Sequence, residues 1–298
     1  MTPDYRLYLN PQLVSKLSRL DIIARLVVEG FITGLHRSPY HGFSVEFAEN
    51  RQYMPGDPTR YIDWKAYGKS ERLFVKTFEE ETNLKSYLLL DASGSMGFSS
   101  EGISKIQYAS YLAAALTYLM LRQRDAVGLV IFDSRIRSYI PPRSAKSHLS
   151  VILKELANTE TSSDTKMEAV FHQLAERIKR RGLIIVISDL LDDADKVLFG
   201  LRHFRHRKHE VIVFHLLDPR EKDFGFEQEA RFVDIETGEE VRADPRLIRQ
   251  EYCSRVSTLV ERYRRGCRES LVDYVPISTD EDLDTALFRY LLKRKRLG

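Results

Sequence analysis

The chain has 298 residues, of which 43% are hydrophobic and 30% are charged, and its formal net charge at pH 7 is +3. This length allows two domains of roughly 150 residues or one large domain, and the many apolar residues exclude a disordered or low-complexity chain. Because proteins that bind nucleic acids usually carry a larger basic excess, we expect no nucleic-acid partner.

The first part of the chain, residues 1–83, is expected to form a smaller region of its own. Apolar residues at helical spacing predict a helix over residues 11–32, interrupted by Gly30 and Gly34. The stretch that follows is dense in turn-forming residues and irregular, and it ends in a predicted strand over residues 72–78. We therefore expect a helical and irregular region before the main domain.

Residues 84–298 alternate between short apolar runs and helical patterns, and we expect them to form one larger domain. The apolar runs are rich in Leu, Ile, Val and Phe and predict buried strands over residues 84–91, 126–133, 182–189 and 210–217. Helical patterns cover residues 105–122, 147–156, 166–180, 195–206, 245–267 and 281–293. This alternation predicts an α/β domain with a doubly wound, mostly parallel sheet and helices on both faces.

The cysteines and the apolar runs indicate where the protein resides. Cys253 and Cys267 lie in one predicted helix, too far apart along it for a disulfide, so we expect free thiols in a reducing compartment. The N-terminus has no signal pattern, and the longest apolar-rich run, over residues 111–121, is far shorter than the ~20 residues of a membrane span. We expect a soluble, cytoplasmic protein.

Polar residues follow the predicted strands at the points where these end. Asp91, Ser93 and Ser95 follow the first strand, Asp189 ends the strand over residues 182–189, and Thr165 lies on the loop before a helix. Because ligands of such sheets bind beyond the carboxyl ends of the strands, we expect these side chains to converge at one edge. Their oxygen atoms suit a hard cation such as Mg²⁺. Alternatively, the serines form only a turn and the two acids cap helices.

The order of these residues resembles a known metal site. Asp-x-Ser-x-Ser after a buried strand, then a threonine loop, then an acid after a later strand is similar to the metal-ion-dependent adhesion site of von Willebrand factor type A domains. The resemblance implies that Mg²⁺ or Mn²⁺ is held by Asp91, Ser93, Ser95, Thr165 and Asp189. It also implies one open coordination position for an acidic side chain of a partner. Asp164 stands where many relatives have glycine, and it could assist the metal or compete with Thr165.

Nearly the whole chain resembles a bacterial family of unknown function within that superfamily, whose genes often lie beside those of MoxR-type AAA+ ATPases. The resemblance rests on Arg-x-Tyr-x-Pro-Gly-Asp at 51–57, Arg-Tyr-Ile-Asp-Trp-Lys at 60–65, Leu-Asp-Ala-Ser-Gly-Ser-Met at 90–96 and Ile-Ser-Asp-Leu at 187–190. It implies a non-enzymatic interaction protein that works with a MoxR-type AAA+ ATPase in chaperone-like maturation or assembly of other proteins. The chain has no phosphate-binding loop, so any ATP hydrolysis would come from the partner.

Two other functions stay open. The sequence Ser-Gly-Ser-Met-Gly at 93–97 resembles the nucleophile elbow of serine hydrolases, and Ser95, Asp189 and His215 follow the chain order of a hydrolase triad. That interpretation leaves Asp91 without a purpose. In the second alternative, the chain is a structural scaffold whose metal-binding residues are vestigial.

Overall fold

The computed structural model describes residues 20–37, 51–52, 67–68, 73–75, 85–100, 102–162, 166–226, 230–233 and 239–295. At its centre lies a six-stranded sheet with the strand order β10-β7-β6-β3-β4-β5. Its strands are β3 (Lys85–Asp91), β4 (Ala126–Phe132), β5 (Ile136–Arg143), β6 (Leu183–Ser188), β7 (Glu210–Leu217) and β10 (Asp273–Ser278). In this sheet all neighbouring strands are parallel except β4 and β5. The predicted mostly parallel sheet is therefore confirmed.

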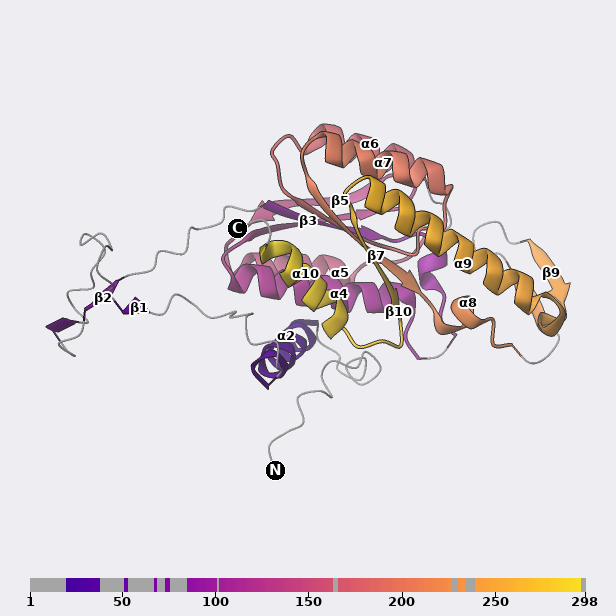
Figure 1. The fold of residues 1–298 in the computed structure, drawn as a ribbon, viewed down its shortest axis with the longest axis horizontal. Helices are drawn as coiled ribbons and strands as arrows, with labels where there is room; N and C mark the ends of the chain where they lie inside the picture. The colour runs from indigo at the N-terminus through magenta and orange to yellow at the C-terminus, as the bar shows by residue number, and fades with distance from the viewer. Residues whose placement is uncertain are drawn as a thin grey trace, which may run out of the picture.

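Helices cover both faces of this sheet (Figure 1). They are α2 (Leu20–Arg37), α4 (Lys105–Arg122), α5 (His148–Ala157), α6 (Met167–Arg177), α7 (Ala194–His206), α8 (Pro219–Asp223), α9 (Pro245–Glu269) and α10 (Asp284–Lys295). Side chains alternate along β3, so that Leu88 and Leu90 pack with α2, α4, α5 and α10, whereas Leu89 packs with α6, α7 and α9. The helices on both faces thus confirm the predicted doubly wound α/β fold class.

The N-terminal helix differs from its prediction. The helix α2 runs through Gly30 and Gly34 to Arg37, so the predicted interruption is wrong. Each glycine costs a helix about 1 kcal/mol, and the packing of α2 on α4 through buried residues offsets this cost; these residues are Ile23, Ala24, Val27 and Val28. Residues 11–19 of the predicted helix lie outside the described residues.

Part of the predicted strand over residues 72–78 is present as β2 (Phe74–Val75), which pairs antiparallel with β1 (Arg51–Gln52). The motifs Pro-Gly-Asp at 55–57 and Asp-Trp-Lys at 63–65 lie outside the described residues. The domain boundary near residue 83 stays a prediction.

Five strands and α-helices of residues 84–298 were not expected from the sequence. They are β5, β10, α8 and the hairpin of β8 (Ala230–Val233) with β9 (Glu240–Ala243). The edge strand β5 contains Pro141 and Pro142 and has no fully buried residue, so it lacks the apolar run that marks a central strand. The other edge strand, β10, contains Pro276, and only half of its residues are buried. It too lacks the apolar run that would have marked it as a strand.

Both cysteines lie in α9 with free thiols, as expected, and Cys267 is buried. None of the helices in the described ranges is long and apolar enough to cross a membrane.

Candidate functional site

Two buried carboxylates lie at the carboxyl ends of neighbouring strands. The strand β3 pairs with β6 so that Leu90 lies beside Ile187, and Asp91 and Asp189 therefore follow at the same edge of the sheet. Each is only 1% exposed. Burial and, to a lesser degree, the neighbouring charge of Asp189 raise the pKa of Asp91 from 3.8 to about 7. The predicted convergence of the two acids is confirmed.

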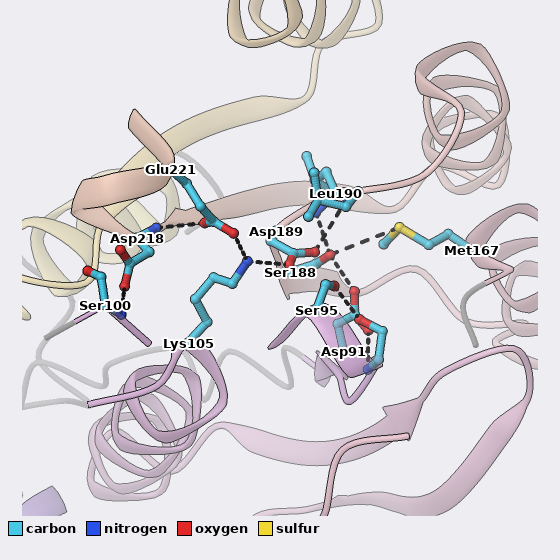
Figure 2. A network of polar contacts seen from close by, with 12 residues as sticks. Asp91, Ser95, Ser100, Lys105, Met167, Ser188, Asp189, Leu190, Asp218 and Glu221 are labelled. Carbon is cyan, nitrogen blue, oxygen red and sulfur yellow. Dashed lines mark hydrogen bonds and ion pairs between the residues drawn. The ribbon is translucent and has the colours of Figure 1, made fainter. Parts of the chain in front are cut away.

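Neutral donors hold the Asp91 carboxylate in place. The backbone N–H of Ser93 donates to Oδ1 at 2.9 Å, and the Ser188 hydroxyl donates to Oδ2 at 2.6 Å (Figure 2). The Ser188 hydroxyl in turn accepts a hydrogen bond from the backbone N–H of Leu190 at 2.8 Å. These bonds lower the pKa of Asp91, but the desolvation is larger, so the net direction is upward. Ser188 is a site residue that the sequence analysis missed, although it directly precedes Asp189.

The two predicted serines lie where a short helix follows β3. Ser93 is fully buried and precedes the 3₁₀ turn Gly94–Gly97, which carries the half-buried Ser95. Their hydroxyl oxygens lie 3.1 Å apart. Two neighbouring oxygen ligands of an octahedral Mg²⁺, each about 2.0–2.1 Å from the ion, lie about 2.9 Å apart. The spacing of the two hydroxyls therefore fits adjacent ligands of one such ion.

Thr165, the fifth predicted ligand, lies outside the described residues, as does Asp164. The described residues on either side of it contact the site loops. The backbone N–H of Ser162 donates to the Ala92 carbonyl at 2.9 Å. The backbone N–H of Met167 donates to the carboxylate of Asp192 at 2.9 Å. The chain thus enters and leaves residues 163–165 beside the loops that carry Asp91 and Asp189.

A buried lysine completes the site, and nothing in the sequence pointed to it. Lys105, the first residue of α4, is 0% exposed, and its Nζ donates to Asp189 Oδ2 at 2.7 Å and to Glu221 Oε1 at 2.6 Å (Figure 2). Burial alone would lower the pKa of Lys105, but the two carboxylates raise it above its usual value. Burial also raises the pKa of Glu221, against the effect of Lys105. No motif marks these residues, because they meet only in the folded chain.

Glu221 is itself anchored by the start of α8. Its side chain accepts from the backbone N–H of Asp218 at 2.9 Å, and the Asp218 carboxylate accepts from the backbone N–H of Arg220 in a capping box. The other Asp218 oxygen accepts from the backbone N–H of Ser100 at 2.9 Å. The loops after β3 and β7 are therefore joined beside the site.

The residues of the alternative hydrolase triad have other partners. The ring of His215 is buried on β7, where its Nδ1 is hydrogen-bonded to the Tyr274 hydroxyl. Burial lowers the pKa of His215 to about 4. The Ser95 hydroxyl contacts Ser93, and the Asp189 carboxylate accepts from Lys105. His215 lies close to Asp189, but among the described contacts no hydrogen bond joins either residue to the Ser95 hydroxyl, so the triad is not assembled.

The described donor set consists of two serine hydroxyls and two carboxylates. No group of three or more His, Cys, Asp or Glu side chains that could hold a metal ion occurs in the described part of the chain. A metal ion at this edge would thus depend on the serine hydroxyls together with Asp91 and Asp189, which is the composition expected for Mg²⁺ or Mn²⁺ rather than for zinc.

Comparison with known proteins gives a family but no activity. The model of the family described as "Protein of unknown function DUF58" matches residues 49–261. The uncharacterized protein Rv1480 of Mycobacterium tuberculosis is 26% identical over 295 residues, which are 96% of this chain and 91% of the relative.

Two solved structures are similar in backbone. The conserved hypothetical protein BatB from Bacteroides thetaiotaomicron is 15% identical with a TM-score of 0.48, over 72% of this chain and 99% of that one. The SpRpn10 VWA domain is 11% identical with a TM-score of 0.39, over 70% of this chain and 94% of that one. At these scores neither likeness carries an argument about function.

Proposed function

Because the chain belongs to the DUF58 family of proteins of unknown function, we propose its function from the site itself: a non-enzymatic protein-interaction module that docks an acidic residue of a partner through a bound Mg²⁺ or Mn²⁺. The observation that carries this proposal is the cluster of Asp91, Asp189 and two serine hydroxyls 3.1 Å apart, at the carboxyl edge of the sheet. Such clustered oxygens, two of them carboxylate, are the ligands that hard divalent cations prefer.

Each residue has a distinct part in the proposal. Asp91 and Asp189 supply the negative charge, and the hydroxyls of Ser93 and Ser95 supply neutral oxygens. By resemblance to the adhesion site, Thr165 adds a third hydroxyl. The bound ion would supply an electrophilic position for a carboxylate from outside, since two acids neutralise a divalent charge only formally and the hydroxyls add none.

The proposed partner is a MoxR-type AAA+ ATPase, and the pair would act in chaperone-like maturation or assembly of other proteins in the cytoplasm. This step rests on the family resemblance of the sequence motifs. An acidic side chain of the ATPase, or of a protein that it remodels, would occupy the open position. A metal-free structural scaffold is the competing interpretation.

The metal site is tested by calorimetric titration of chelator-stripped protein with Mg²⁺ and Mn²⁺. We expect saturable binding by the wild type, at least a tenfold weaker association for Ser95→Ala, and wild-type binding for Ser99→Ala. Ser99 is an exposed serine four residues away and serves as the matched control. Absence of binding at millimolar metal, or equal binding by Ser95→Ala and the wild type, would refute the site.

The partner is tested separately with the purified MoxR-type ATPase encoded in the same genome. We expect the two proteins to associate in Mn²⁺ and to separate in EDTA, and we expect Ser95→Ala to associate weakly under both conditions. Association that is equally strong in EDTA would favour the scaffold, because no metal-bridged carboxylate would then be needed.

A further inference from the structure

The position of Lys105 is unfavourable on two counts. It is a fully buried ammonium, and it occupies the first turn of α4, where the helix dipole is positive and disfavours cations. The backbone N–H groups of Ser104 and Gln107 are paired within the capping box, and the backbone N–H of Lys105 donates to the Phe98 carbonyl at 3.1 Å. Two ion pairs, to the carboxylates of Asp189 and Glu221, compensate the ammonium of Lys105, and the Phe98 ring lies 5.9 Å from its Nζ.

The charged groups form a row that ends at the serines. From Glu221 the row passes to Lys105 and then to Asp189, and on the far side of Asp189 lie Asp91 and Ser95 (Figure 2). The ammonium is bonded to one oxygen of Asp189 at 2.7 Å, while the other oxygen accepts only a long bond of 3.4 Å from the backbone N–H of Leu191. Asp189 is thus shared between an ion pair and the proposed metal site.

We propose that Lys105 is a built-in counter-ion of Asp189 that competes with the divalent cation. Its charge lowers the metal affinity of the site, and its ion pairs keep Asp189 and Glu221 compensated when no metal is bound. This inference rests on the proposed function, because it concerns the same metal site. Glu221 is the positioning residue of this device, since it draws part of the ammonium charge away from Asp189.

Simple electrostatics sets the direction of the effect. A positive charge bonded to a metal ligand repels an incoming cation, and the repulsion is screened little in a buried site. Removal of Lys105 takes away the cation that the described contacts place at Asp189 and Glu221, so a divalent ion should bind more tightly. Removal of the Glu221 charge leaves Lys105 uncompensated on that side, so the ion should bind more weakly.

The test compares Mn²⁺ binding by calorimetry for the wild type, Lys105→Met, Glu221→Gln and the double variant. We expect Lys105→Met to raise the association constant at least tenfold and Glu221→Gln to lower it severalfold. Lys222→Met is the matched control, because it removes the same charge from an exposed side chain next to Glu221 and should bind as the wild type does. Thermal unfolding in EDTA should show a lower midpoint for Lys105→Met, and Mn²⁺ should restore it.

The outcomes separate this inference from the proposed function. Binding by the wild type with no tighter binding by Lys105→Met overturns the inference alone. Binding by Lys105→Met when the wild type binds nothing refutes a metal site in the native protein but still supports the competition by Lys105. Absence of binding by both proteins refutes the metal site and the inference together. If Lys105→Met does not fold, the double variant is compared with Glu221→Gln, and the same tenfold gain is expected in that background.

Discussion

The burial of Asp91 predicts that the metal-free protein loses stability as the pH rises. The pKa of Asp91 is about 7 in the folded protein, against 3.8 for an unperturbed group. The folded state therefore holds this proton more tightly than the unfolded chain does, and the resulting stabilisation is complete below pH 4 and lost as the pH rises through 7. A pKa difference of about three units between the folded and unfolded states corresponds to about 4 kcal/mol of unfolding free energy.

The variant Asp91→Asn isolates this effect. An amide is neutral at every pH, is close in shape to the protonated acid, and can still accept from the backbone N–H of Ser93. Urea unfolding in EDTA should therefore show that the wild type loses up to about 4 kcal/mol relative to Asp91→Asn between pH 4 and pH 8. His215 acts in the opposite sense, because its lowered pKa of about 4 removes stability as the pH falls from 6.5. The comparison cancels this effect, since both proteins contain His215.

A free-energy difference between the two proteins that is constant with pH would refute the reasoning, because Asp91 would then titrate alike in both states. Saturating Mn²⁺ supplies a second check. If the ion binds the ionised carboxylate, the loss of stability at high pH should shrink in the wild type and persist unchanged in EDTA.

Three further substitutions test the packing around the site by urea unfolding. Tyr263→Phe removes the hydroxyl that donates to the Leu190 carbonyl at 2.9 Å and should lower the free energy of unfolding by about 1 kcal/mol. An unchanged free energy of unfolding would mean that this bond does not hold the loop after β6. Phe171→Ala should cost about 3–5 kcal/mol, because the ring is fully buried against two other phenylalanines at 5.7 Å, and a cost under about 1 kcal/mol would contradict that packing. Gly200→Ala should lower the free energy of unfolding by about 1–3 kcal/mol, since the added Cβ would lie 2.9 Å from the Cβ of Phe171. An unchanged free energy of unfolding would mean that α6 and α7 can move apart without cost.

Local patterns were enough to predict the central elements of the fold. The bounds of α4 and β7 agree with the sequence prediction at both ends, because one is a long, largely apolar helix and the other a largely apolar strand. The edge strands β5 and β10 were missed for the reverse reason. Their side chains are partly exposed and include proline, so only their pairing with a neighbour makes them strands.

The part of the site that lies at the ends of predicted strands could be found from the sequence. Asp91, Ser93 and Asp189 each come at or just after an apolar run, and adjacent parallel strands bring such positions together. Lys105 and Glu221 could not be found in this way. Lys105 lies 84 residues from Asp189 and 116 residues from Glu221 in the chain, and it stands between Ser104 and Ile106 at the start of a largely buried helix.

The two acids of the site are held by different kinds of group, and they should therefore respond to different variables. Among the described contacts, Asp91 accepts only from neutral donors, whose effect on its pKa is smaller than that of burial, so the proton stays bound up to about pH 7. Asp189 is instead paired with the Lys105 ammonium, which is fixed to the core helix α4. For a metal ion to bind at this edge, Asp91 must lose its proton, and the Lys105 ammonium must give up part of its interaction with Asp189. The first depends on pH and the second on Lys105, so Mn²⁺ affinity should rise with pH in both the wild type and Lys105→Met, with the two curves separated by a nearly constant factor.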